Sequence, residues 1–158
     1  MTYPLQAINE ALAMLPAKMD TRAARVQLIA IGAQESKDWE HRRQMGNGPA
    51  RGFWQFEKNG GVKGVMEHPL KTVRDLARQV CAARNCPWRR ETIWSNLEHD
   101  DVLACAFARL NLYGDPYALP AIGDCDEAWD LYLRVWRPGE PHPEDWPERY
   151  ALAVSLTA

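Results

Sequence analysis

The chain has 158 residues, a formal net charge of −2 and an apolar fraction of 46%. A chain of this length buries roughly 70% of its unfolded surface, so it needs neither a disulfide nor a metal to fold. Its near-neutral charge gives no electrostatic basis for binding nucleic acid. The sequence therefore predicts one domain, residues 1–158, with no nucleic-acid partner.

The cysteines and histidines predict no metal site and no cofactor. The four cysteines form no CxxC pair, and the four histidines are scattered without an HExxH motif. Three of the cysteines lie in apolar helical contexts, which is typical of buried free thiols. A disulfide between Cys81 and Cys86 is the alternative that the sequence leaves open.

The sequence predicts no insertion into a membrane. No apolar run is long enough to span one, and the first residues, MTYPLQAINEALAML, carry polar and charged side chains through their apolar part. We therefore expect no signal peptide and synthesis in a cytoplasm, so that any action outside it requires separate delivery.

Hydrophobic periodicity predicts helices along most of the chain. The first runs from Pro4 to Leu15, and the second from Thr21 to Glu35 with Asp20 or Thr21 as its N-cap. Glycines and Pro49 then predict a loop over residues 36–58 that holds a short hairpin. Later helices are expected over residues 69–84, 89–97, from 100 or 101 onward, 126–136 and 144–156. The predicted fold class is mainly α, with a small irregular or β-hairpin insertion after the second helix.

Glu35 ends the second predicted helix. Ala24, Leu28, Ile31 and Glu35 share one helix face, and the opposite side is also apolar. A helix that is apolar on both sides is buried, so Glu35 leaves the core at the C-terminal end. Burial and the negative end of the helix dipole both raise a carboxyl pKa. A carboxyl that stays protonated near neutral pH suits the general acid of a glycosidase; the alternative is a loop cap that accepts backbone N–H groups.

Glu35-Ser36, a loop, and then Gly52-Phe53-Trp54-Gln55-Phe56 resemble the E-S … G-L-M-Q pattern of lysozyme-like proteins. That superfamily includes the lytic transglycosylases and goose-type lysozymes, and the resemblance covers residues 20–60. It implies a lysozyme-like single domain in which Glu35 is the catalytic acid. It also implies that Ser36 and the block from Gly52 to Gln55 bind substrate, with Phe53 and Trp54 as a cleft wall.

The third motif of this superfamily, usually A-x-Y-N-A-G, corresponds to residues 106–114 of this chain. The compact Tyr-Asn pair is missing there, and Tyr113 is the candidate for the tyrosine ligand. The chain as a whole also resembles small proteins that tailed bacteriophages encode.

Glu57 occupies the position of the Asp that follows the Gln in goose-type lysozymes, G-L-M-Q-V-D. By this resemblance Glu35 as acid and Glu57 as base would form an inverting pair, with carboxyls about 6.5–9.5 Å apart. The competing mechanism is that of lytic transglycosylases, in which Glu35 alone acts and the C6 hydroxyl of the sugar closes an anhydro ring. A solvated loop charge is the structural alternative for Glu57.

Two neighbouring polar residues have a binding and a structural interpretation each. Gln55 offers an amide to the N-acetyl group or hydroxyls of a sugar, or else pins the loop backbone. Arg51 suits the peptide-stem or lactyl carboxylates of a wall polymer, or else is a solvated surface charge.

These features predict a peptidoglycan glycosidase that cleaves the MurNAc-GlcNAc β-1,4 bond, with the glycan strands as its partner. It would act at the bacterial cell wall, either as an endolysin or as an enzyme carried in the virion. The first alternative is a structural virion protein with a lysozyme-like fold and little activity, whose partners are other virion proteins. The second is an all-α adaptor in which the Glu35 block is coincidental.

Overall fold

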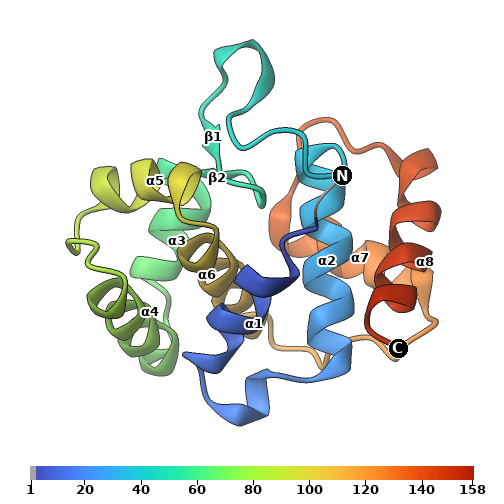
Figure 1. The fold of residues 1–158 in the computed structure, drawn as a ribbon, viewed down its shortest axis with the longest axis horizontal. Helices are drawn as coiled ribbons and strands as arrows, with labels where there is room; N and C mark the ends of the chain where they lie inside the picture. Colours follow the sequence, from blue (N-terminus) through green and yellow to red (C-terminus); the bar gives the residue numbers. More distant parts are fainter. Residues whose placement is uncertain (1–2) are drawn as a thin grey trace.

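The computed structural model describes residues 3–158, so Met1 and Thr2 of the predicted domain lie outside the described residues. Eight α-helices accompany a small antiparallel sheet of β1 (Ala50–Arg51) and β2 (Phe56–Glu57) (Figure 1). The helices are α1 (Leu5–Ala13), α2 (Arg22–Ser36), α3 (Lys63–Met66), α4 (Lys71–Ala83), α5 (Arg90–His99), α6 (Asp101–Tyr113), α7 (Cys125–Trp136) and α8 (Trp146–Leu156). The predicted class, mainly α with a hairpin after the second helix, is confirmed.

A 3₁₀ turn changes one predicted helix boundary, and a π-helical turn follows the predicted loop. Residues Pro143–Asp145 form a 3₁₀ turn, so α8 begins at Trp146 instead of Glu144. Residues Lys58–Val62 form a π-helical turn that leads directly into α3. Turns of the π-helical kind are rare in proteins and occur often at functional sites.

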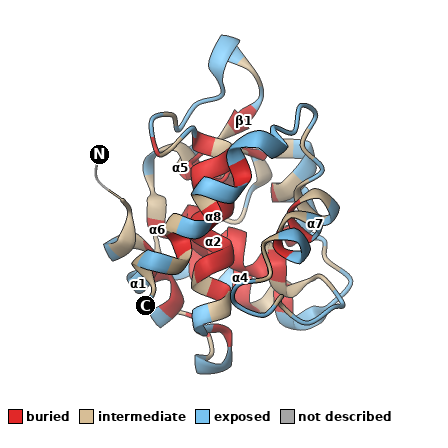
Figure 2. Cartoon of the chain, turned by 90° about the vertical axis from the view of Figure 1, so that its right-hand side faces the viewer, coloured by how far each residue is buried: buried red, intermediate tan, exposed pale blue. Residues whose placement is uncertain are grey.

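Helix α2 lies in the middle of the molecule and packs against α8 on one side and α6 on another. Thr21 is its N-cap, because the hydroxyl oxygen accepts the backbone N–H of Ala24 at 3.1 Å. Figure 2 shows α2 buried along most of its length. The buried apolar residues form one core cluster that extends from Ile8 in α1 to Ala153 in α8. The sequence predicted that this helix is buried because it is apolar on two opposite sides, and the burial of most α2 residues confirms the prediction.

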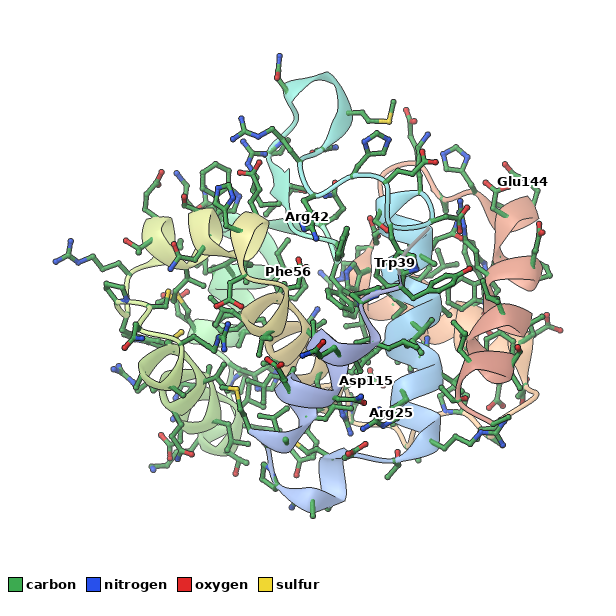
Figure 3. The ribbon with its side chains drawn as sticks, in the orientation of Figure 1. Arg25, Trp39, Arg42, Phe56, Asp115 and Glu144 are labelled. Carbon is green, nitrogen blue, oxygen red and sulfur yellow. The ribbon has the colours of Figure 1, made fainter. Side chains whose placement is uncertain are left out.

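The chain turns sharply directly after Glu35. Lys37, Asp38 and Trp39 all have positive φ angles, of 52°, 58° and 68°. The buried hydroxyl of Ser36 stabilises this turn, since it donates to the Gly32 carbonyl at 2.6 Å and accepts the Trp39 N–H at 2.7 Å. Trp39 then lies beside α2 (Figure 3), where the ring covers Gly32 so closely that a Cβ atom there would come within 2.3 Å of it.

The hairpin is attached to the core by two buried aromatic residues. Phe53 and Trp54 are 3% and 1% exposed, and both pack edge-on against Trp39. The indole N–H of Trp54 donates to the Leu28 carbonyl of α2 at 2.9 Å. These contacts hold the hairpin against the end of α2, which brings Gln55 and Glu57 to the same side as Glu35.

The four cysteines are free thiols, and Cys81, Cys86 and Cys105 are buried. The disulfide considered for Cys81 and Cys86 is not formed. Within residues 3–158, no helix combines the length and apolarity that a membrane crossing requires.

We expect Gly52→Ala to destabilise the fold by about 1–3 kcal/mol. Gly52 has a φ of +79°, and a Cβ atom there would lie 2.7 Å from the Leu97 carbonyl oxygen. The control is Gly139→Ala, because the space around Gly139 is open and its φ is not positive. Chemical denaturation measures both variants, and an equal loss in the two would contradict this account of Gly52.

Candidate active site

The site is a groove made of two adjoining cavities. The Glu35 cavity has a volume of about 550 Å³ and lies between the end of α2, the hairpin and the segment after α7. The glycine cavity, about 670 Å³, is lined by Gly60, Gly61 and Gly64 of the π-helical turn and α3. Both cavities are lined by the same four residues at their junction, which are Gln55, Glu57, Trp136 and Arg137. The two cavities therefore adjoin at these residues, and together they are called the cleft.

Glu35 lies in the wall of the Glu35 cavity and is partly buried. Burial raises the pKa of Glu35 to about 7, and the hydrogen bond from Tyr132 acts against this rise. The carboxyl is therefore divided between its protonated and ionised forms near neutral pH. This is the state in which a carboxyl can give up a proton and take one back within a single reaction cycle.

Tyr132 of α7 is the direct partner of Glu35. Its hydroxyl donates to Oε1 of Glu35 at 2.7 Å. The ring is 3% exposed and stacks on Trp146 of α8, with centroids 5.4 Å apart and planes at 7°. Burial and the nearby Glu35 carboxyl raise the pKa of Tyr132, so the phenol remains a donor. Tyr132 therefore fixes the orientation of the carboxyl through a bond that joins α7 to α2.

Trp136 forms the wall at the junction of the two cavities. Its indole N–H donates to the Trp54 carbonyl at 2.8 Å, and its ring packs on Phe56 with centroids 5.8 Å apart. The side chain is only partly buried, so part of an immobilised aromatic surface faces the cleft. Such a surface suits the apolar face of a sugar ring.

Unfavourable backbone conformations gather around this cleft. Among residues 3–158, seven residues other than glycine have positive φ angles, and five of them either line the cleft or form the turn behind it. These five are Lys37, Asp38, Trp39, Gln55 and Arg137. Conformations of this kind cost of order 1–3 kcal/mol each and persist where the surrounding structure enforces them, often at functional sites.

The structure brings three of the predicted site residues together. Glu35, Gln55 and Glu57 line the Glu35 cavity, and the exposed Glu57 is at its junction with the glycine cavity. Both residues of the predicted acid–base pair therefore line the same cavity. Gln55 lies at this junction and also holds the loop backbone, which was the structural alternative for this residue. Its side-chain amide donates to the Gly52 carbonyl at 2.9 Å and to the Arg42 carbonyl at 3.3 Å.

The other predicted substrate-binding residues lie elsewhere. Ser36, Gly52, Phe53 and Trp54 are buried behind the cleft, so they support it from within the core and do not form its surface. Tyr113 lies at the end of α6, where Lys18 stands 5.7 Å from its ring, and it is not among the residues that line the cleft. Of the predicted motif block, Gln55 and Glu57 line the cleft, because the burial of the other side chains keeps them from its surface.

Arg51 is engaged in local contacts. Its guanidinium donates to the carbonyls of Gly48 and Ala50 and lies 4.4 Å from the ring centroid of Trp94. It also lies 3.9 Å from the Glu98 carboxylate. These contacts hold Arg51 within the hairpin region, so it is not a free cation for a wall carboxylate.

Three residues that the sequence analysis did not assign to the site line the cleft. The sequence analysis placed Tyr132 and Trp136 only within the helix predicted over residues 126–136, although they are four residues apart and so share a helix face. Asn111 lines the glycine cavity from α6, two residues before Tyr113. The departure from the third motif therefore places an amide in the cleft where the sequence pattern suggested a phenol.

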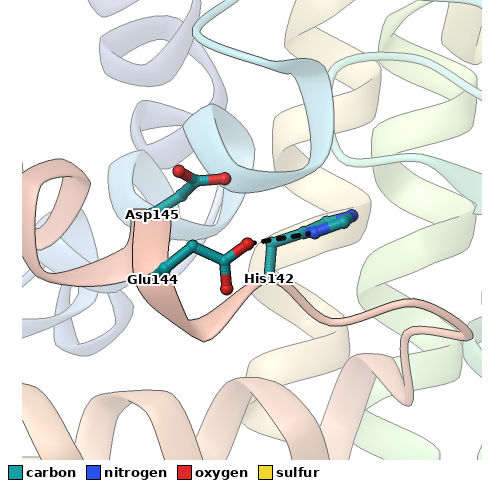
Figure 4. Close-up of side chains that lie close together, drawn as sticks. All are labelled: His142, Glu144 and Asp145. Carbon is teal, nitrogen blue, oxygen red and sulfur yellow. Dashed lines mark ion pairs between the residues drawn. The ribbon is translucent and has the colours of Figure 1, made fainter.

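One cluster of metal-ligand types lies beside the cleft. His142, Glu144 and Asp145 each offer an atom within 4.8 Å of the others, and His142 Nδ1 lies 3.4 Å from Glu144 Oε1 (Figure 4). All three side chains are exposed. The backbone carbonyl of His142 has a structural role, because it accepts the amide of Gln34 at 3.0 Å and ties the segment before α8 to α2. Exposed carboxylates cluster in this way without a metal, so we assign no metal site to them.

Comparisons of the chain with models of protein families, with curated proteins and with solved structures gave no match. The lysozyme-like resemblance accordingly remains a prediction from the motifs, and the chemistry of the cleft has to be argued from its own residues.

We expect Glu35→Gln to stabilise the protein above neutral pH by on the order of 3 kcal/mol and to have little effect below pH 4. The folded-state pKa of about 7 exceeds the ordinary value of 4.5. Between these values the native state holds the proton more strongly than the unfolded state does. Stability of the wild type therefore falls as pH rises through this window, and the amide removes that loss. Urea denaturation from pH 4 to 8 tests this, and parallel curves for the two proteins would contradict it.

We expect Tyr132→Phe to raise the pKa of Glu35 further. The hydrogen bond from the phenol favours the ionised carboxyl, and its loss leaves desolvation unopposed. Tyr113→Phe is the matched control, since Tyr113 is outside the cleft. NMR titration of the labelled Glu35 carboxyl carbon reports the value directly. An unchanged or lowered pKa in Tyr132→Phe would show that this bond does not tune the acid.

Proposed function

We propose that this protein is a peptidoglycan glycosidase that cleaves the MurNAc-GlcNAc β-1,4 bond with Glu35 as its general acid. The observation that carries the proposal is the Glu35 carboxyl in the wall of the cleft, which accepts a hydrogen bond from Tyr132 at 2.7 Å and whose pKa desolvation raises to about 7. The E-S … G-F-W-Q sequence pattern supports the same assignment. A partly buried Trp136 and the junction amide of Gln55 are groups that suit a sugar polymer.

In the proposed reaction, protonated Glu35 gives its proton to the glycosidic oxygen as the bond from that oxygen to C1 breaks. The Tyr132 hydroxyl donates to the carboxyl throughout, so it stabilises the carboxylate that forms. Glu57 then removes a proton from a water molecule that attacks C1 from the opposite face, which inverts the configuration at C1. The position of Glu57 in the same cavity favours hydrolysis over the reaction in which the C6 hydroxyl attacks.

We further propose that the enzyme serves phage-mediated degradation of the bacterial cell wall, as an endolysin or as a component of the virion. This part rests on the resemblance to small proteins of tailed bacteriophages. A structural virion protein without activity is the alternative, and it is the outcome that absence of turnover would favour.

We expect wild-type protein to release muropeptides from purified peptidoglycan and Glu35→Gln to lose at least about 10²-fold in rate. The amide keeps the size of the side chain and still accepts from Tyr132, but it has no acidic proton. Mass analysis of the products is the measurement, and circular dichroism checks the fold of the variant. Release by the variant at the wild-type rate, or no release by folded wild type between pH 5 and 8, would refute the proposal.

We expect Glu57→Gln to lower kcat by about 10²-fold, because a base is needed to activate the water. The products of the wild type would carry reducing ends. Glu148→Gln is the control for loss of one carboxylate, since Glu148 is an exposed residue of α8 away from the cleft. Anhydro ends together with full activity of Glu57→Gln would instead assign the reaction to the C6 hydroxyl and leave Glu57 without a catalytic role.

A further inference from the structure

A third, basic cavity adjoins the glycine cavity of the cleft. It has a volume of about 750 Å³ and is lined by four cationic side chains, Lys58, Arg78, Arg89 and Arg90. Asn59 and Glu67 line both this basic cavity and the glycine cavity. The two cavities therefore adjoin at the π-helical turn and the end of α3, which is where a branch of a polymer in the cleft would enter the basic cavity.

The charge of this region departs from that of the chain. Residues 71–90 contain six Lys or Arg and a single acid, although the chain as a whole carries a net charge of −2. Two of the four cations in the basic cavity have partners, since Lys58 pairs with Glu91 at 2.7 Å and Arg90 lies 3.7 Å from Glu67. None of the ion pairs found within residues 3–158 includes Arg78 or Arg89.

Trp88 fixes the geometry of one of these unpaired cations. The Arg78 guanidinium lies 4.6 Å from the centroid of the Trp88 ring, and the ring is partly buried. The Arg78 side chain is exposed, so its guanidinium N–H groups are accessible to a carboxylate, which an arginine can bind with two parallel hydrogen bonds. Arg89 directly follows Trp88 in the chain, so the second unpaired cation belongs to the same cavity.

We propose that the basic cavity binds the carboxylates of a short acidic peptide branch carried by the glycan in the cleft, through Arg78 and Arg89. This inference rests on the proposed function and specifies its substrate as peptide-bearing glycan instead of bare sugar chain. Arg51, the cation that the sequence suggested for such carboxylates, is occupied by contacts within the hairpin region.

A small number of carboxylates fits this cavity better than a long polyanion does. Proteins that bind a nucleic-acid backbone typically neutralise about 6–10 phosphates. This cavity offers two unpaired cations, flanked by the acids Glu67 and Glu91.

The first test measures binding without turnover. The probe is a synthetic acidic tripeptide with two free carboxylates, and the readout is the indole N–H resonance of Trp88 in the full-length protein. We expect saturable shifts of Trp88, about five- to tenfold weaker binding in Arg78→Gln/Arg89→Gln, and no binding of the same peptide with its carboxylates amidated. Lys18→Gln/Lys71→Gln removes two positive charges outside the cavity and is expected to bind like the wild type.

Three results would overturn the proposal. These are no shift of Trp88, equal binding of the amidated peptide, and tighter binding of poly(glycerol phosphate), which would make the ligand a phosphodiester polymer. Because this measurement needs no catalysis, saturable binding of the peptide by a protein that releases no muropeptides would refute the proposed function and still support an acidic-peptide site.

The second test uses turnover. We expect Arg78→Gln/Arg89→Gln to raise KM for peptide-bearing glycan about five- to tenfold with kcat unchanged, and to leave KM for glycan stripped of its peptides at the wild-type value. Equal effects on the two substrates, or no effect on either, would contradict a role for this cavity in recognising the branch.

Discussion

The hydrogen bond between Tyr132 and Glu35 is the interaction on which the geometry of the site depends. It joins the end of α2 to α7 at 2.7 Å and is itself enclosed by aromatic packing, since Tyr132 stacks on Trp146. A buried carboxyl without a donor would be costly, and a buried phenol without an acceptor equally so. Each group therefore satisfies the other, and together they set both the orientation and the proton affinity of the acid.

The rest of the fold supports this pair from two sides. On one side the hairpin is held against α2 by Phe53 and Trp54, so that Glu57 enters the cavity of Glu35. On the other side Trp136 closes the wall by donating to the Trp54 carbonyl. The positive φ angles after Glu35 and at Gln55 are the conformational cost of this convergence, and buried contacts such as the Ser36 hydroxyl to the Trp39 N–H offset it. Core packing and site geometry are thus the same set of interactions.

The charge distribution extends the site beyond the acid. The helices α3 to α5 carry the basic cavity and lie on one side of the central helices, while α7 and α8 lie on the other (Figure 1). The Glu35 cavity and the glycine cavity together form the cleft, and the basic cavity adjoins the glycine cavity at Asn59 and Glu67. Under the proposed function this order separates the tasks, with bond cleavage near Glu35 and recognition of an anionic branch near Arg78 and Arg89.

The sequence by itself determined the helices, the buried character of α2 and the raised pKa of Glu35, because periodicity and apolar content on both faces of a helix are local properties. It also located the segment that brings Glu57 to Glu35. Only the tertiary structure decided which side chains of that segment face the cleft. The block from Gly52 to Trp54 turned out to be core, and the partner of Glu35 came from α7, almost a hundred residues away in the chain. Such pairings depend on how helices pack against one another. The helical pattern of a sequence predicts on which face of its helix a residue lies, but not which residue of another helix it contacts.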